Sequence, residues 1–287
     1  MDRRTFMLSA AAFATGCTRN APTHESAMNT AAPLGLQLYT LRDMMAEDAG
    51  ATLELVASVG YREVEFAGYF EHTPQQMRAL LDAAGLQAPS THISYDDFAA
   101  DPDRVIGHAL AMGHRYIVVP YLAEEQRSID AYHVHCEKFN AWGEACKAAG
   151  LQFAYHNHDF EFTETDGQIP YDILLANTDP DLVAMQLDLA WARAGNVDSI
   201  AYLEAWPGRF PSVHIKDLDV DGKEADIGAG DIAFADIFAH ARLAGIKHGF
   251  VERDHASDVR YSIQYNYDAI APLWTSAMSA ASQGETR

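Results

Sequence analysis

Basic residues are few in this 287-residue sequence: 20 Lys and Arg stand against 41 Asp and Glu, which gives a formal net charge of −21. A surface of this sign repels phosphate backbones, so nucleic acids are excluded as expected partners. After the N-terminus the chain also lacks any apolar run near the roughly 20 residues that cross a bilayer. We therefore expect no membrane-spanning helix in the main domain.

Cysteine is scarce as well, with three in the chain. Cys136 and Cys146 fall on one predicted helix, where ten residues at about 1.5 Å each place them roughly 15 Å apart. This distance exceeds the reach of a disulfide, so we assign the two thiols no chemistry. The 48% hydrophobic content excludes disorder for most of the chain and suffices for one large barrel or two smaller domains.

The first 17 residues have the order of an export signal. Arg3 and Arg4 precede an apolar stretch, residues 6–14, and small residues then lead to Cys17. The arginine pair with its following residues resembles a twin-arginine signal, and the four residues ending at Cys17 resemble a lipobox. Together they predict a lipid on Cys17. The alternative is an ordinary secretory signal with an incidental Cys17.

Both alternatives predict a protein that leaves the cytoplasm. We expect residues 1–17 to be a twin-arginine-like lipoprotein signal and the Ala-, Thr-, Asn- and Pro-rich residues 18–33 to be a flexible tether. The expected product is a periplasmic lipoprotein that meets the membrane only through the lipid on Cys17.

One structural unit recurs from Leu34 onward: a β-rich run, a polar loop, an amphipathic helix, a glycine and another β-rich run. Each of these glycines suits the left-handed end of a helix. The strands that this repeat predicts are Gly35–Tyr39, Glu63–Ala67, Ala88–His92, Tyr116–Pro120, Gln152–His156, Val183–Asp188, Ser212–Lys216 and His248–Glu252. Eight alternating units in about 250 residues favour a closed barrel over an open sheet. We therefore predict that residues 34–287 form a single-domain (β/α)8 TIM barrel.

Polar residues close nearly every predicted strand. In such barrels the active site forms where the strands end, so these side chains should converge on one mouth. They are Gln37, Tyr39, Glu65, His92, His156, His158, Asp188, His214, Lys216, Glu252 and Asp254. Residues two apart on a strand share a face, so His156 can point the same way as His158, and His214 the same way as Lys216.

A cluster of imidazoles and carboxylates suits a divalent ion, and mixed nitrogen and oxygen ligands favour a transition metal. We expect Mn, with Co, Mg or Zn as alternatives. Each His could instead be a structural hydrogen-bonding residue, and each carboxylate could pair with Lys or Arg. Without a cation, however, ionised Asp188 and Glu252 in one pocket would cost several kcal/mol.

Three further residues are candidates for substrate binding. Glu65 either contacts substrate or pairs with an arginine, and His92 either contacts substrate or makes a structural hydrogen bond. Trp191 follows Asp188 by three residues and either forms a stacking wall for the apolar face of a sugar or packs at the barrel rim.

Four segments carry a resemblance to a known family. They are Phe153–Phe162 (FAYHNHDFEF), Gln186–Trp191 (QLDLAW), Val213–Asp217 (VHIKD) and Phe250–Asp254 (FVERD). In order and spacing they resemble the xylose-isomerase-like superfamily, and within it the sugar phosphate isomerase/epimerase group, over roughly Leu34 to Pro272. That superfamily includes ketose 3-epimerases, inosose dehydratase and apurinic-site endonucleases.

The resemblance implies a metal site built by the last four strands from a Glu, an Asp, a His and a second Glu. Asp188, His214 and Glu252 match the last three positions, whereas the first Glu falls at or next to His156. This departure puts a symmetrical two-glutamate mechanism in doubt. Glu161, just beyond, could supply the missing carboxylate. The implied ligands are therefore His156, Asp188, His214 and Glu252.

The implied reaction is isomerisation or epimerisation of a sugar or keto-sugar through a metal-stabilised enediolate. Glu252 is the candidate base, His158 or Glu161 returns the proton from the other face, and Lys216 stabilises negative charge. A lyase or dehydratase acting on a keto-glycoside or inosose through the same enediolate is the nearest alternative. A metal-dependent phosphoesterase and a carbohydrate-binding lipoprotein are more distant ones. The substrate would be a small carbohydrate, and the sequence leaves oligomerisation open.

Overall fold

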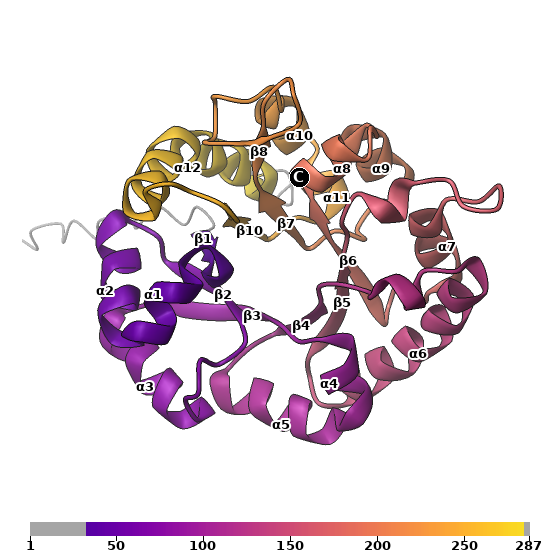
Figure 1. The fold of residues 1–287 in the computed structure, drawn as a ribbon, viewed down its shortest axis with the longest axis horizontal. Coiled ribbons are helices and arrows are strands. Elements are labelled where there is room, and N and C mark those ends of the chain that lie inside the picture. Colours follow the sequence, from indigo (N-terminus) through magenta and orange to yellow (C-terminus); the bar gives the residue numbers. More distant parts are fainter. Residues whose placement is uncertain (1–32, 284–287) are drawn as a thin grey trace, which may run out of the picture. The chain divides into compact units, whose positions relative to one another are not determined.

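The computed structural model describes residues 33–283, in which eight parallel strands close into a barrel in the order β1-β10-β7-β6-β5-β4-β3-β2 (Figure 1). These strands are β1 Leu34–Gln37, β2 Glu63–Ala67, β3 Gln87–His92, β4 Tyr116–Val119, β5 Gln152–His156, β6 Val183–Asp188, β7 Ser212–Ile215 and β10 His248–Val251. The (β/α)8 barrel is therefore confirmed. β2, β5 and β6 begin and end where the sequence predicts.

Helices surround the barrel on its outer face (Figure 1). They are α1 Arg42–Glu47, α2 Ala49–Val59, α3 Pro74–Ala84, α4 Tyr95–Ala100, α5 Pro102–Met112, α6 Ile129–Ala148, α7 Pro170–Asn177, α8 Leu189–Ala194, α9 Ser199–Ala205, α10 Phe234–Phe238, α11 Ala241–Ala244 and α12 Val259–Gln283. Short 3-10 turns are η1 Leu38–Leu41, η2 Glu124–Gln126 and η3 Phe160–Phe162. Within residues 33–283 no helix has the length and apolar character that a membrane span requires.

Local sequence explains where these helices begin and end, and α5 is an example. The Asp101 side chain accepts a hydrogen bond from the Arg104 amide, and Pro102 occupies the first turn, where its missing N–H costs nothing. Gly113 ends the helix at φ 78°, a left-handed conformation that glycine adopts without strain. The chain can then turn directly into β4.

The apolar core lies mainly between the barrel and its helices. Aromatic rings of α4, α6 and β5 pack together there, including Phe98, Trp142 and Phe153, whose ring centroids are 4.7–5.9 Å apart. A smaller apolar cluster comprises Tyr116, Val118, Ala154 and Ala184. Cys136 and Cys146 are buried free thiols, as expected.

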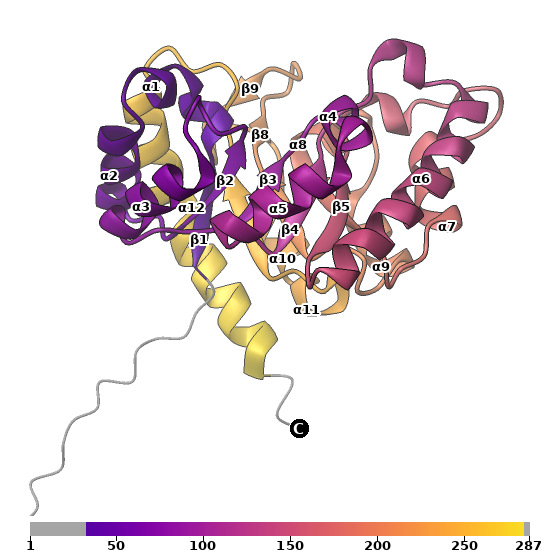
Figure 2. The same cartoon turned by 90° about the horizontal axis from the view of Figure 1, so that it is seen from below.

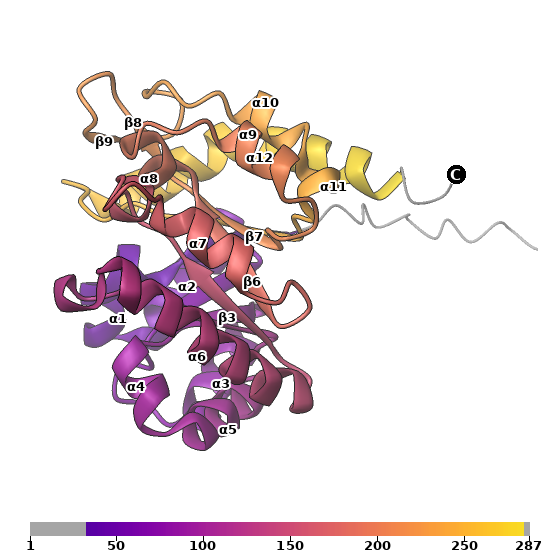
Figure 3. The same cartoon turned by 90° about the vertical axis from the view of Figure 1, so that its right-hand side faces the viewer.

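Loops after the strands gather at one end of the barrel. Figure 2 shows the hairpin of β8 Asp217–Leu218 and β9 Glu224–Ala225 on the same side as α1, α4 and α8, and Figure 3 shows α11 at the opposite end. The Asp217 carboxylate accepts the backbone N–H groups of Gly228, Gly230 and Ile232, which fastens the loop behind the hairpin. The predicted signal with Cys17, and residues 18–32 of the predicted tether, lie outside the described residues.

Gly143 in α6 gives a test of this packing. A Cβ at this position would lie 2.6 Å from the backbone oxygen of Leu182, so Gly143→Ala should destabilise the fold by about 1–3 kcal/mol although alanine favours helices. Gly107 in α5 is the matched control, because a Cβ there meets nothing within 4 Å and Gly107→Ala should stabilise by about 0.5–1 kcal/mol. Urea unfolding measures both. Equal effects in the two variants would contradict the close approach.

Candidate metal centre and active site

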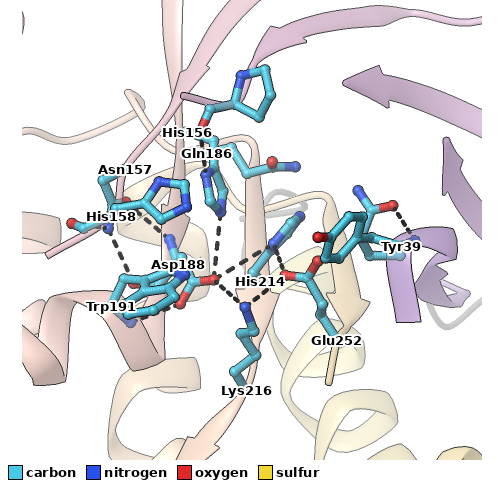
Figure 4. Close-up of polar contacts among 12 residues, drawn as sticks. Tyr39, His156, Asn157, His158, Gln186, Asp188, Trp191, His214, Lys216 and Glu252 are labelled. Atoms are coloured by element: carbon cyan, nitrogen blue, oxygen red, sulfur yellow. Dashed lines mark hydrogen bonds and ion pairs between the residues drawn. The ribbon is translucent and has the colours of Figure 1, made fainter. Parts of the chain in front are cut away.

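Four buried side chains meet at the mouth of the barrel (Figure 4). His156 ends β5, Asp188 ends β6, His214 lies in β7 and Glu252 follows β10. One nitrogen or oxygen atom of each lies within 4.8 Å of those of the others. The four residues that the family resemblance implies as ligands therefore lie together, as a metal site requires.

His156 and Asp188 present two hydrogen-bond acceptors to each other. His156 Nδ1 lies 3.1 Å from the backbone oxygen of Pro120, which can only accept, so Nδ1 carries the proton. Burial lowers the pKa of His156, which keeps the ring neutral and leaves a lone pair on Nε2. Nε2 lies 3.4 Å from Asp188 Oδ2, and among the described residues neither atom has a hydrogen-bond partner. A cation bound by both atoms would remove this cost.

His214 lies between two carboxylates. Its Nε2 is 2.6 Å from Glu65 Oε2, and its Nδ1 is 2.9 Å from Glu252 Oε2. Burial alone would lower the pKa of His214, but the charges of Glu252 and Glu65 raise it well above the usual value. A metal on Nδ1 would take the place of that proton and leave Nε2–H on Glu65, the carboxylate–histidine–metal arrangement common in metalloproteins.

Glu65 is fully buried beneath His214. Its carboxylate accepts hydrogen bonds from Gln37 Nε2 at 2.8 Å, from Gln186 Nε2 at 2.7 Å and from the Ser90 hydroxyl. Burial would raise its pKa, but His92 and His214 hold the pKa well below the usual value, so the group is ionised. It is not among the residues that line the cavity. The structure thus corrects the predicted substrate contact, because Glu65 contacts His214 and its neighbours instead.

Lys216, directly after β7, supplies positive charge to the same centre. Its Nζ lies 2.7 Å from Asp254 Oδ2, 3.1 Å from Glu252 Oε2 and 3.7 Å from Asp188 Oδ2. Burial would lower the pKa of this ammonium, but Glu252 and Asp188 raise it well above its usual value. Lys216 and a protonated His214 face four carboxylates, those of Glu65, Asp188, Glu252 and the half-buried Asp254, so the site favours a further cation.

A cavity of about 570 Å³ opens above these groups. Of the predicted residues, those that line it are Tyr39, His92, His156, His158, Trp191, Lys216, Glu252 and Asp254. Sequence reasoning did not single out Tyr121, an exposed aromatic in the wall, because the preceding strand closes without a polar residue. It also missed Gln186, although this polar residue lies two positions before Asp188 in an otherwise apolar strand, which indicates the same face.

Two of the cavity residues combine structural contacts with exposure to the cavity. His92 Nε2 lies 2.7 Å from Gln186 Oε1 and 3.2 Å from Glu65 Oε2, so its predicted structural hydrogen bond is present while the ring still lines the wall. The Trp191 ring lies 5.2 Å from Lys216 Nζ and 5.2 Å from the His158 ring. Both positions suit contact with a bound sugar.

The chain after β5 brings His158 to the cavity and takes Glu161 away from it. The His158 ring stacks on Phe160 with the planes 12° apart, and burial, aided by His156, lowers its pKa to about 3. Its Nδ1 is buried and has no hydrogen-bond partner among residues 33–283. The ring is therefore neutral, and the residue lines the cavity.

Glu161 is fully buried behind this turn. Its carboxylate accepts hydrogen bonds from the Tyr155 hydroxyl and from the His158 backbone N–H, the latter at 2.7 Å. It does not line the cavity and does not belong to the ligand cluster. The structure corrects the predicted acid/base role and the suggestion that Glu161 supplies the missing carboxylate, because its oxygens face the turn that carries His158.

Comparison with known proteins adds to this geometry. A family model described as xylose isomerase-like TIM barrel matches residues 53–253. The chain belongs to this family. An inosose dehydratase of Geobacillus kaustophilus is 26% identical over a 192-residue alignment, which covers 59% of this chain and 62% of that protein. The chain thus spans about three fifths of the length of this relative.

Solved structures of similar proteins align with a larger share of this chain than the inosose dehydratase sequence does. A sugar phosphate isomerase/epimerase from Parabacteroides distasonis is 28% identical, with a TM-score of 0.73 over 86% of this chain and 97% of that one. A second structure of that description from the same organism is 26% identical, with a TM-score of 0.74 over 84% of this chain and 99% of that one. Both alignments cover nearly the whole length of the Parabacteroides distasonis proteins.

Glu161 gives a pH-dependent test. Burial raises its pKa from 4.5 to about 7, so folding favours the protonated form. Its contribution to stability is complete below the unfolded pKa and is lost as the pH rises through about 7. Glu161→Gln should therefore gain stability relative to the unsubstituted protein between pH 5 and pH 8. Urea unfolding of both proteins at each pH measures the difference, and a constant difference would contradict the assignment.

Proposed function

We propose that the chain is a divalent-metal-dependent isomerase or epimerase that acts on a sugar or keto-sugar through an enediolate. The observation that carries this proposal is the buried pair of acceptors, His156 Nε2 and Asp188 Oδ2, which face each other at 3.4 Å beside His214 and Glu252. The similar sugar phosphate isomerase/epimerase structures from Parabacteroides distasonis support it.

Two imidazoles and two carboxylates balance the charge of a divalent ion once His214 Nδ1 has lost its proton. This mixed ligand set favours Mn, with Co, Zn or Mg as alternatives. Such an ion, when bound, would polarise a substrate carbonyl as a Lewis acid. The second cluster of Glu65, His92 and His214 shares His214 with the first, and its members bond to one another. It therefore gives little support to the multi-metal phosphoesterase alternative.

Glu252 is the proposed base. It lines the cavity, and although burial would raise its pKa, Lys216 and His214 hold the pKa well below the usual value, so the carboxylate is ionised. The proton comes from the carbon next to the substrate carbonyl. Negative charge then develops on the substrate oxygens, where the ammonium of Lys216 can stabilise it.

The opposite face of the cavity favours a second candidate reaction. The usual first Glu falls at or next to His156, and Glu161 is buried behind the turn, so the second acid/base group would be His158. An arrangement with one carboxylate base, Glu252, and a neutral imidazole, His158, suits elimination, in which the same enediolate loses a leaving group. The inosose dehydratase relative supports a lyase or dehydratase acting on a keto-glycoside or inosose as the alternative.

We also propose that the protein is exported to the periplasm and anchored through Cys17. The support is the order of residues 1–17, which lie outside the described part of the chain. A periplasmic location favours free over phosphorylated sugars as substrates. An oligomer remains compatible with the fold.

A panel of keto-sugars in deuterated water tests the reaction. The protein is first freed of metal by chelation and then given Mn, and we expect it to place deuterium at one substrate carbon. If the substrate loses neither water nor an aglycone, the reaction is isomerisation or epimerisation. If either is lost, the protein is the lyase. Glu252→Gln should lower kcat by about 10³-fold, because the base is lost. Mass spectrometry of the products measures both. Unchanged activity in Glu252→Gln would contradict the proposal and favour a non-catalytic carbohydrate-binding protein.

A pair of glutamates on β2 tests the metal centre independently of turnover. Glu65→Gln should weaken Mn binding by about 10–100-fold, because His214 loses the carboxylate that orients it. Glu63→Gln is the matched control: Glu63 is buried on the same strand and also bonds a histidine, His248 at 2.8 Å, but towards the other end of the barrel. Titration calorimetry measures both. Equal weakening in the two variants would overturn the role of Glu65.

A further inference from the structure

A second cavity adjoins the one above the metal centre. Its volume is about 410 Å³, and residues 40–44 and 254–257 line it together with Val259. Asp254 and His255 line both cavities, so the two lie on either side of the turn that follows β10. The first cavity, at about 570 Å³, is already ample for a single sugar ring.

The turn between the cavities is held from two sides. Glu224, on the β9 strand of the hairpin, accepts the backbone N–H groups of Asp254 at 3.1 Å and of His255 at 2.9 Å. From the other side Arg42 donates to the backbone oxygen of Asp254 at 3.1 Å. The wall shared by the two cavities is therefore a fixed part of the structure.

The second cavity suits a neutral, hydroxylated group. Arg42 lies beside Asp43 and Asp254, so both signs of charge are present and a phosphate or carboxylate would meet repulsion as well as attraction. Arg42 donates to the backbone oxygens of Tyr39 and Asp254, which leaves further guanidinium N–H groups for ligand hydroxyls. Ser257 adds a hydroxyl, and Met44 adds apolar surface.

Tyr39 connects the two cavities. Its ring is 44% exposed, lines the first cavity and lies 4.3 Å from the guanidinium carbon of Arg42, which lines the second. Glu252 lines the same cavity as Tyr39. An exposed aromatic ring at this position offers a stacking surface for the apolar face of a sugar that spans both cavities.

We propose, resting on the function proposed above, that the substrate is a disaccharide-sized glycoside bound across both cavities. The reacting keto ring lies over Glu252 and Lys216. The second ring, or a neutral hydroxylated aglycone, lies between Arg42 and Ser257. Tyr39 contacts the ligand where it passes the Asp254–His255 turn.

Binding to the Mn-loaded protein tests this proposal without requiring turnover. The probes are D-fructose and its 3-, 4- and 6-O-glucosyl derivatives, which differ from it by one added ring. Calorimetry should show at least one derivative binding about tenfold more tightly than fructose, because the added ring gains contacts in the second cavity. If every derivative binds no more tightly than fructose, the proposal is overturned, whatever the protein catalyses.

Blocking the second cavity completes the test. Ala256→Trp should fill it and bring the affinity ratio of derivative to fructose to about one. Ala148→Trp, at an exposed position at the end of α6, is the matched control and should leave the ratio unchanged. Ser257→Trp serves the same purpose if circular dichroism shows Ala256→Trp to be misfolded. If the affinity ratio of derivative to fructose is unchanged in both cavity variants, the proposal is overturned. If no sugar exchanges deuterium, only the proposed reaction is contradicted, and the binding proposal stands.

Discussion

Excess negative charge buried at one end of the barrel is the constraint on which the rest of the site depends. Asp188 and Glu252 lie within 4 Å of Lys216 Nζ, and Asp254 competes for the same ammonium. His156 cannot relieve this excess, because its proton is on the nitrogen that faces the Pro120 carbonyl. The proposed divalent cation would satisfy both the acceptors that lack hydrogen-bond partners and the charge, and would so account for side chains that otherwise destabilise the fold.

The barrel interior supports this arrangement from below. Gln37, Ser90 and Gln186, from β1, β3 and β6, donate hydrogen bonds to the Glu65 carboxylate, and Glu65 in turn accepts from His214. Each donor is itself buried, so the carboxylate cannot relax into solvent. Because this network holds the His214 ring, the orientation of one candidate ligand on β7 depends on its neighbour β6 and also on β1, β2 and β3.

The two faces of the cavity differ in chemistry. Glu252 and Lys216 form a charged side, whereas His158, stacked on Phe160 and close to Trp191, forms a neutral aromatic side. The first Glu that the family resemblance implies falls at or next to His156, and the carboxylate of Glu161 is buried against the His158 backbone N–H. This asymmetry is the physical reason why elimination is the closest rival of epimerisation. The adjoining cavity beyond Asp254 extends the charged side towards a larger sugar ligand.

The sequence alone determined the barrel and the residues at its mouth. Helix-ending glycines and alternating β and α units mark each repeat locally, and strand-end residues such as Asp188 must meet because parallel strands end at the same rim. Only the tertiary structure decided which of these side chains face the cavity. Glu65 and Glu161 look like site residues in sequence, but their hydrogen bonds to His214 and to the His158 amide turn them inward. Such partners lie in other strands or depend on the exact path of a turn, and side-chain direction there follows from packing and hydrogen bonding rather than from spacing.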